Sequence, residues 1–169
     1  MTGQEKGRIA WTIIIAVMII YMIVAALYES LLQPFIILLS VPLAMIGVFA
    51  AFVITRFPFD SSAYIGVLLM AGIVVNNAIL LVDHINRKKK RGLPRLEAVI
   101  TGTKERTRPI LMTTATTILG MLPVLLLQVN AGRRDIWSTL ALCMVGGLAS
   151  STIFIFIIIP VFTYYGERK

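Results

Sequence analysis

Two clusters of uncharged polar side chains lie inside consecutive long apolar stretches of the sequence. Asn76 and Asn77 lie together in one stretch, and the next stretch contains four threonines, at positions 113, 114, 116 and 117. An amide can hydrogen-bond a carboxylic acid or help coordinate a cation, but it neither takes up nor releases a proton near neutral pH. In an apolar medium, an amide or hydroxyl without a partner carries a large free-energy penalty. These residues therefore predict either contacts between helices or the wall of a hydrated ion path.

The elements that hold these residues are five stretches without a single Asp, Glu, Lys, Arg or His, each at least 20 residues long. A bilayer core about 30 Å thick is crossed by roughly 20 apolar residues in a helix. Uninterrupted apolar runs also lack the alternation of barrel strands, so helices are the fitting solution. We predict an all-α, polytopic transmembrane helical bundle in one membrane domain, residues 1–169, with spans at about 9–28, 31–54, 61–84, 109–128 and 136–165.

The composition supports a membrane protein and argues against an enzyme. Hydrophobic residues make up 58% of the chain, charged residues 14%, and the mean hydropathy is +0.89, which is unlike a soluble domain. The single cysteine, Cys143, excludes an intrachain disulfide. One histidine, His84, and one intramembrane cysteine cannot supply a nucleophile with its base or a zinc-binding set. We therefore expect no enzymatic activity, no metal site and no cofactor.

Basic residues are distributed unevenly between the two ends of the predicted bundle. Eleven Lys and Arg residues, nine of them between Arg87 and Arg108, belong to one side, and the other side receives five: Lys6, Arg8, Arg56, Arg133 and Arg134. Because cytoplasmic loops carry the excess of Lys and Arg, we expect the basic loop and the C-terminus in the cytoplasm. The net charge of +8 then suits membrane lipid headgroups rather than nucleic acid, since the basic run lacks interleaved aromatic residues.

An odd number of spans with an external start is unusual, because residues 1–8 do not explain how the first helix is delivered in that direction. We expect this chain to be a piece of a longer protein. Between the third and fourth spans, residues 93–105 place apolar side chains on one stripe, which predicts an amphipathic helix along the cytoplasmic face. A merely solvated linker helix is the alternative. Pro42 is expected to kink the second span.

The polar residues of the third and fourth spans lie at matching depth. Asn76 and Thr113 are each roughly 8–10 Å inside the cytoplasmic boundary, at about 1.5 Å per residue. Asn76 shares its helix face with Asp83. The glycines expected to allow close helix packing are Gly72, Gly120, Gly146 and Gly147. Hydrogen bonding between helices and an ion path both remain open, but none of the five charge-free stretches contains a carboxylate, lysine or arginine to carry a proton, so a charged partner must come from elsewhere.

Five short strings, in order along the chain, resemble the C-terminal membrane region of resistance-nodulation-division (RND) efflux permeases of the hydrophobe/amphiphile or multidrug type. They are residues 26–30 (Ala-Leu-Tyr-Glu-Ser) with Pro34, 41–43 (Val-Pro-Leu), 72–83 (Gly-Ile-Val-Val-Asn-Asn-Ala-Ile-Leu-Leu-Val-Asp), 108–114 (Arg-Pro-Ile-Leu-Met-Thr-Thr) and 160–162 (Pro-Val-Phe). Together they cover about residues 10–166.

The resemblance implies that the chain is similar to the last five of twelve transmembrane helices of such a pump. It would then lack the porter domains and be inactive alone. Complete pumps of this family are inner-membrane trimers that exchange protons for exported drugs, lipids or metals, often with a periplasmic adaptor and an outer-membrane channel. The partner of this chain would be the N-terminal half of the same transporter. An autonomous small membrane channel or a helical assembly subunit is the competing interpretation.

The resemblance also implies roles for individual residues in ion coupling. In many RND pumps, a relay joins an acidic pair on the fourth helix to a lysine, a threonine and an arginine. Asn76 stands at the lysine position, Thr113 at the threonine position and Arg106 at the arginine position. We expect Asn76, Asn77 and Thr113 to orient a carboxylate pair from the missing half, with Arg106 near the inner mouth. Asp83 is a second candidate.

Overall fold

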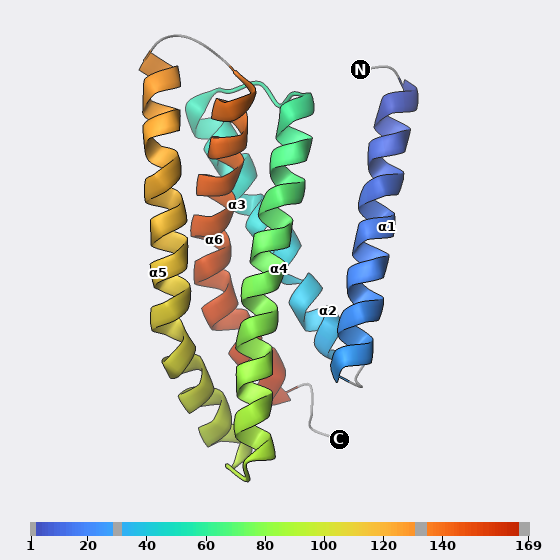
Figure 1. Ribbon diagram of the computed structural model, residues 1–169, viewed down its shortest axis with the longest axis vertical. Helices are drawn as coiled ribbons and strands as arrows, with labels where there is room; N and C mark the ends of the chain where they lie inside the picture. Colours follow the sequence, from blue (N-terminus) through green and yellow to red (C-terminus); the bar gives the residue numbers. More distant parts are fainter. Residues whose placement is uncertain (1–2, 29–31, 131–134, 166–169) are drawn as a thin grey trace.

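The computed structural model describes residues 3–28, 32–130 and 135–165, and all of the regular structure in these residues is helical. The predicted all-α bundle is confirmed. The helices, shown in Figure 1, are α1 (Gly3–Tyr28), α2 (Leu32–Leu38), α3 (Ser40–Thr55), α4 (Ser61–Lys90), α5 (Arg95–Asn130) and α6 (Ile136–Tyr165). Among the described residues, four stretches are long and apolar enough to cross a membrane: Gln33–Thr55, Ser61–Lys90, Arg95–Leu127 and Ile136–Tyr164.

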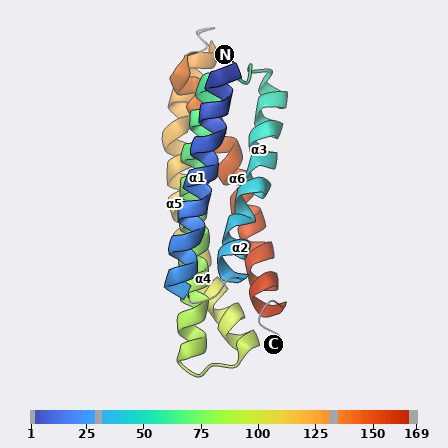
Figure 2. The same cartoon turned by 90° about the vertical axis from the view of Figure 1, so that its right-hand side faces the viewer.

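Helix α6 is the centre of the bundle and packs against α3, α4 and α5 (Figures 1 and 2). Its buried side chains include Cys143, Leu148 and Ile155, all at most 2% exposed. Glycines allow the helices to approach closely, because a Cβ added at Gly146 would lie 2.7 Å from the Cβ of Ala51. Close backbone approach of this kind is a main source of helix association in lipid, where burial of apolar surface supplies little.

The second predicted span is divided into α2 and α3 at Leu39. Pro42 has no N–H to donate to the preceding turn, so the helix is weakened three residues before it. The hydroxyl of Ser40 donates to the carbonyl of Ile37 at 2.6 Å, which satisfies one backbone oxygen at the interruption. The kink expected at Pro42 is therefore found at the start of the same turn.

The predicted separation between an interfacial helix at 93–105 and a span from residue 109 is wrong. The structure has one continuous helix, α5, with Pro109 and Pro123 inside it. A proline disrupts the preceding turn without ending a helix when neighbouring groups satisfy the freed carbonyls. The N-terminal part of α5 is inclined relative to the rest (Figure 1), so the two predicted elements are joined by a bend.

Helix α1 lies beside α2 and apart from the other helices (Figure 1). Many of its apolar side chains are exposed, among them Trp11 at 67% and Ile23 at 61%. Its apolar part, Ile14–Ala26, lies inside the predicted span 9–28. The hydroxyl of Tyr28 donates to the carbonyl of Ile79 at 3.1 Å, which ties the end of α1 to α4. Of the basic residues used to assign orientation, Arg133, Arg134, Arg168 and Lys169 lie outside the described residues.

Both ends of α4 are defined by local chemistry. The carboxylate of Asp60 accepts the N–H groups of Ser62 and Ala63, each at 3.1 Å, and so caps the first turn. The helix ends in the basic run, and Gly92, at φ +87°, turns the chain toward α5. This turn makes α4 and α5 antiparallel neighbours, as Figure 1 shows, and sets the polar residues of both helices side by side.

Candidate functional site

A cavity of about 450 Å³ lies where α4 and α5 meet α6. It contains four of the five residues that the sequence singled out for ion coupling: Asn76, Asn77, Arg106 and Thr113. Its complete lining is Ile73, Asn76, Asn77, Leu80, Arg106, Pro109, Ile110, Thr113, Thr114, Thr117 and Leu148. The antiparallel pairing of α4 with α5 therefore produces the juxtaposition that the matching depths of Asn76 and Thr113 predict.

The nitrogen-bearing side chains of the cavity have unused hydrogen-bonding capacity. Arg106 has a buried Nε atom that finds no hydrogen-bond partner among the described residues. Within the same part of the chain, neither Asn76 nor Asn77 makes a side-chain hydrogen bond to a described residue. A buried guanidinium N–H without an acceptor is unfavourable, and a guanidinium pairs best with a carboxylate. The cavity therefore combines a positive charge with two amides, which are donors and acceptors.

The threonine hydroxyls of α5 are largely satisfied within the helix. Thr113 donates to the carbonyls of Pro109 and Ile110, at 3.2 and 3.0 Å, and Thr117 donates to Thr113 at 2.9 Å. Thr116 bonds back to Met112 in the same way but does not line the cavity. Such bonds to the preceding turn leave hydroxyl oxygens free to accept, while their protons are occupied. The threonines thus add acceptors and small volume to the cavity.

Thr114 is the exception, because it links α5 to α6. Its Oγ1 lies 3.3 Å from the Oγ1 of Thr152, and both residues are 6% exposed. Thr152 also bonds to the carbonyl of Leu148 at 2.7 Å. Thr152 and Leu148 are neighbours of the site that the sequence did not predict. The signal available was the polar pair at 151 and 152 inside the fifth span, but a charge-free stretch does not reveal which face meets α5.

Asp83 does not reach the cavity. Its Oδ2 pairs with the Nε of Arg87 at 2.8 Å, one helical turn further along α4. An ion pair between such neighbours on an exposed helix face contributes little free energy. The structure therefore gives Asp83 a local partner and leaves the cavity without an acidic side chain from the described residues.

A second ionic cluster joins α4 to α5 below the cavity. Glu105 accepts hydrogen bonds from Lys88 at 2.7 Å and from His84 at 2.7 Å. These two bonds, with that from Lys88 contributing most, hold the pKa of the Glu105 carboxyl below its ordinary value. Glu105 precedes the charge-free stretch that starts at Pro109, so the cluster lies at the end of the bundle. No group of three or more potential metal ligands occurs among the described residues.

The four glycines predicted to pack helices fall into two classes. A Cβ at Gly146 would lie 2.7 Å from the carbonyl oxygen of Gly47, and one at Gly147 would overlap the side chain of Met70. At Gly72 and Gly120, by contrast, no described atom lies within 4 Å of the added Cβ. Gly146 and Gly147 therefore face neighbouring helices, whereas Gly72 and Gly120 lie on open faces of α4 and α5.

The fold and the cavity define a class of protein: a multi-pass membrane bundle whose polar site lies between helices. The sequence matches the AcrB/AcrD/AcrF family over residues 2–165. The chain belongs to this family of RND efflux permeases, whose members are transporters. It is accordingly assigned to the inner membrane as a multi-pass protein.

Curated relatives give the same result. The chain is 35% identical to the multidrug resistance protein MdtC of Erwinia amylovora over 166 residues, 98% of this chain and 16% of that protein. It is 34% identical to the swarming motility protein SwrC of Bacillus subtilis over 154 residues, 91% of this chain and 14% of that protein. The chain thus spans about a sixth of the length of these relatives.

Solved structures with the same fold include a heavy metal efflux pump in two crystal forms. The TM-score is 0.84 at 28% sequence identity for one form and 0.79 at 27% for the other. In both cases the match covers 98% of this chain and 16% of the pump chain. The arrangement of all six described helices is therefore similar to one part of a much larger transporter.

Proposed function

We propose that the chain forms the ion-coupling transmembrane part of an RND efflux transporter. In this proposal, it corresponds to the last five of twelve helices, and the cavity receives a carboxylate from the N-terminal half of the same transporter. The observation that carries the proposal is the buried Nε of Arg106, which has no described partner and borders a cavity of about 450 Å³. A carboxylate is the group that best satisfies a buried guanidinium.

The coupling step follows from the protonation state of that carboxylate. When ionised, it pairs with Arg106, and at an effective dielectric constant of about 20 such a pair at ~4 Å gains about 4 kcal/mol. When protonated, it loses this attraction and instead donates its O–H to an amide oxygen of Asn76 or Asn77. Each uptake or release of an ion therefore shifts α5 relative to its neighbour. Arg106 supplies the positive charge, because Asn76 stands where many relatives have a lysine.

The rest of the transporter supplies what this chain does not contain. By family analogy, the complete protein is a homotrimer that exports drugs or other small molecules, with a periplasmic adaptor and an outer-membrane channel. The distribution of Lys and Arg supports an orientation in which the turn around Gly92 and the C-terminus lie in the cytoplasm. The cavity then opens near the cytoplasmic side, where it can exchange ions with that compartment.

The proposal is tested by ion-coupled efflux of the full-length transporter that carries this segment. Arg106→Gln is expected to lower efflux by at least about 100-fold, because it removes the attraction of about 4 kcal/mol that distinguishes the two protonation states of the carboxylate. Asn76→Ala and Thr113→Ala should each lower it, while Thr116→Val serves as the matched control outside the cavity. Membrane abundance and trimer formation of each variant show that the loss is functional.

Two outcomes contradict the proposal. Unchanged efflux in both Asn76→Ala and Thr113→Ala would remove the cavity from the coupling mechanism. Ion flux through liposomes containing only the 169-residue chain would instead identify a small autonomous channel.

A further inference from the structure

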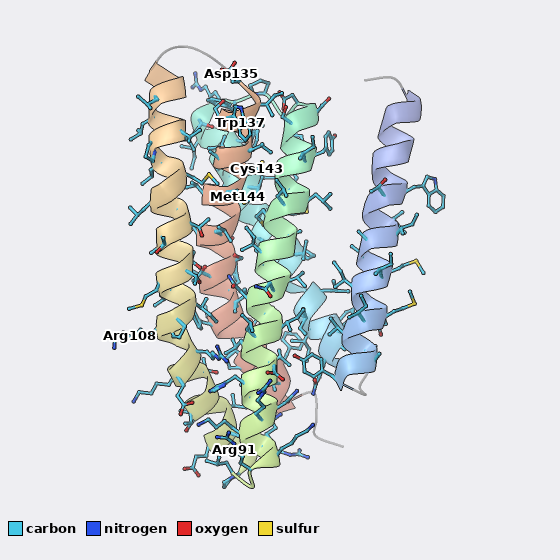
Figure 3. The ribbon with its side chains drawn as sticks, in the orientation of Figure 1. Arg91, Arg108, Asp135, Trp137, Cys143 and Met144 are labelled. Carbon is cyan, nitrogen blue, oxygen red and sulfur yellow. The ribbon has the colours of Figure 1, made fainter. Side chains whose placement is uncertain are left out.

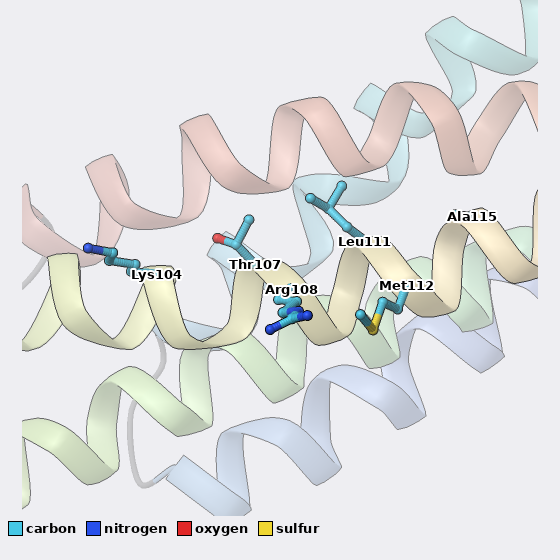
Figure 4. Close-up of a pocket in the computed structure, with 6 residues that line it drawn as sticks. All are labelled: Lys104, Thr107, Arg108, Leu111, Met112 and Ala115. Atoms are coloured by element: carbon cyan, nitrogen blue, oxygen red, sulfur yellow. The ribbon is translucent and has the colours of Figure 1, made fainter.

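A second cavity, also about 450 Å³ but shallow and widely open, lies on a different face of α5 and shares no lining residue with the first. It is lined over three turns of the helix by Lys104, Thr107, Arg108, Leu111, Met112 and Ala115, drawn in Figure 4. Lys104 and Ala115 mark its two ends, about 16 Å apart at ~1.5 Å per residue. The cavity is therefore elongated along the helix axis, with cations toward one end and apolar side chains toward the other.

Both cations of this cavity are exposed and unneutralised. Within the described part of the chain, neither Lys104 nor Arg108 pairs with a carboxylate. Two nearby basic residues differ in this respect, since Arg87 pairs with Asp83 and Lys88 with Glu105. Figure 3 shows Arg108 extending away from the bundle on the outer side of α5. Residues four apart on a helix lie above one another, so two uncompensated charges occupy adjacent turns of one face.

The apolar end of the cavity lies in the charge-free part of α5. Pro109 begins that stretch, which makes Arg108 the last charged residue before the membrane interior. Leu111 and Met112 are 46% and 55% exposed, so their side chains present apolar surface outward. The cavity thus crosses from the depth of lipid headgroups to the depth of acyl chains.

We infer that this cavity binds one anionic phospholipid. Lys104 and Arg108 hold the phosphate of the headgroup, and an acyl chain lies along Leu111, Met112 and Ala115. The hydroxyl of Thr107 donates to the carbonyl of Thr103 at 2.8 Å, so it is not available to the phosphate. Recognition therefore rests on the two charges and on the apolar groove. This site is independent of the proposed ion coupling.

The experiment measures binding of phosphatidylglycerol to the purified chain in neutral detergent by native mass spectrometry. Removal of each cation is expected to weaken binding roughly 5-fold, and Lys104→Gln with Arg108→Gln about 30-fold, from the attraction of a basic side chain to an anionic lipid surface. The control is Lys90→Gln with Arg91→Gln, which removes the same charge from the C-terminal end of α4 and should leave binding within about 2-fold. Lys104→Arg should retain binding. Circular dichroism checks the fold of each variant.

Further binding measurements identify which parts of the lipid the cavity recognises. Ala115→Trp fills the apolar end but keeps both cations, so it should weaken phosphatidylglycerol binding and leave any binding of inorganic phosphate unchanged. Phosphatidylcholine with the same acyl chains should bind more weakly than phosphatidylglycerol. The inference is overturned if the double variant binds normally, if the control pair loses as much, if both lipids bind equally, or if Ala115→Trp has no effect.

Discussion

The seam between α3 and α6 and the seam between α4 and α5 use the same kinds of residue with opposite results. In the first, Gly47 and Gly146 bring the backbones together, and the hydroxyl of Ser150 donates across to the carbonyl of Leu43 at 3.0 Å. In the second, Gly102 of α5 lies close to Ile85 of α4, whereas Gly72 and Gly120 lie on open faces of the two helices, outside the cavity lining. The first seam is closed at its glycines, whereas the second is close at Gly102 and opens into the cavity around Asn76 and Thr113.

The difference shows what a small residue contributes in a membrane. Lipid tails are as apolar as a leucine side chain, so helices associate only where backbones fit closely or polar groups pair. At Gly146 a neighbouring backbone supplies that fit. Gly72 and Gly120 face open space outside the cavity lining, and the proposed N-terminal half would supply a surface that packs against them.

The largest expected effect compares the same substitution in the two seams. Gly146→Ala should destabilise the isolated chain by about 1–3 kcal/mol, because the new methyl group meets Ala51 and the carbonyl oxygen of Gly47, each at 2.7 Å. Gly120→Ala should be neutral or stabilise the chain by up to about 1 kcal/mol, since alanine favours helix and nothing obstructs it. Reversible unfolding in mixed detergent micelles measures both.

A larger residue at the open position extends this comparison to the full-length transporter. Gly120→Leu should be tolerated by the isolated chain but should lower assembly or efflux of the complete protein, if the N-terminal half covers that face. Equal destabilisation by Gly146→Ala and Gly120→Ala in the isolated chain would show that the two seams do not differ.

A smaller effect is expected from the buried hydroxyl pair that closes the back of the cavity. Thr114→Val removes the contact with Thr152 while it keeps the branched shape, and it should destabilise the chain by about 1 kcal/mol, within the range for hydrogen bonds between membrane helices. Thr116→Val is the matched control, because Thr116 is exposed and bonds only to its own helix. If Thr116→Val loses as much stability as Thr114→Val, the effect comes from helix propensity and not from the link between α5 and α6.

Much of the architecture follows from the sequence because charge is excluded from hydrocarbon. Within the described residues, each predicted span corresponds to a helix or, for the second, to α2 with α3, and Asn76 and Thr113, for which the sequence predicts matching depth, line one cavity. The depth of a residue in the membrane follows from its distance along the helix to the nearest charged residue, so it can be predicted from the sequence alone. A turn as short as that around Gly92 leaves the two helices little choice but to lie antiparallel.

Rotation of a helix about its axis is harder to predict, and it accounts for the errors. All four glycines looked equivalent, yet only Gly146 and Gly147 face a neighbour. Gly47, which makes one of the closest contacts, was missed because its surroundings are uniformly apolar and carry no periodic signal. The continuity of α5 was missed because Pro109 marks a probable helix boundary, while neighbouring turns here hold the helix together.

The smallest expected effect concerns the ionic cluster that holds the α4–α5 seam at its basic end. The pKa of Glu105 is lowered in the folded chain, so its contribution to stability is present above the unfolded pKa and is lost as pH falls through the folded value. Glu105→Gln should therefore reduce the thermal midpoint slightly at pH 7 and flatten its fall toward pH 3. Thermal unfolding in a neutral detergent across this range measures the difference from the unmodified chain.

Glu97→Gln provides the matched comparison, because Glu97 lies in the first turn of the same helix and pairs with no described residue. The thermal midpoint of this variant should fall between pH 7 and pH 3 as that of the unmodified chain does. Since Lys88 and His84 both contact Glu105, Lys88→Gln should reduce the fall of the thermal midpoint toward pH 3 only in part. If Glu105→Gln also leaves the fall of the thermal midpoint below pH 7 unchanged, this end of the α4–α5 seam is held by helix packing around the turn and not by charge. The two seams would then differ only in how closely their helices fit.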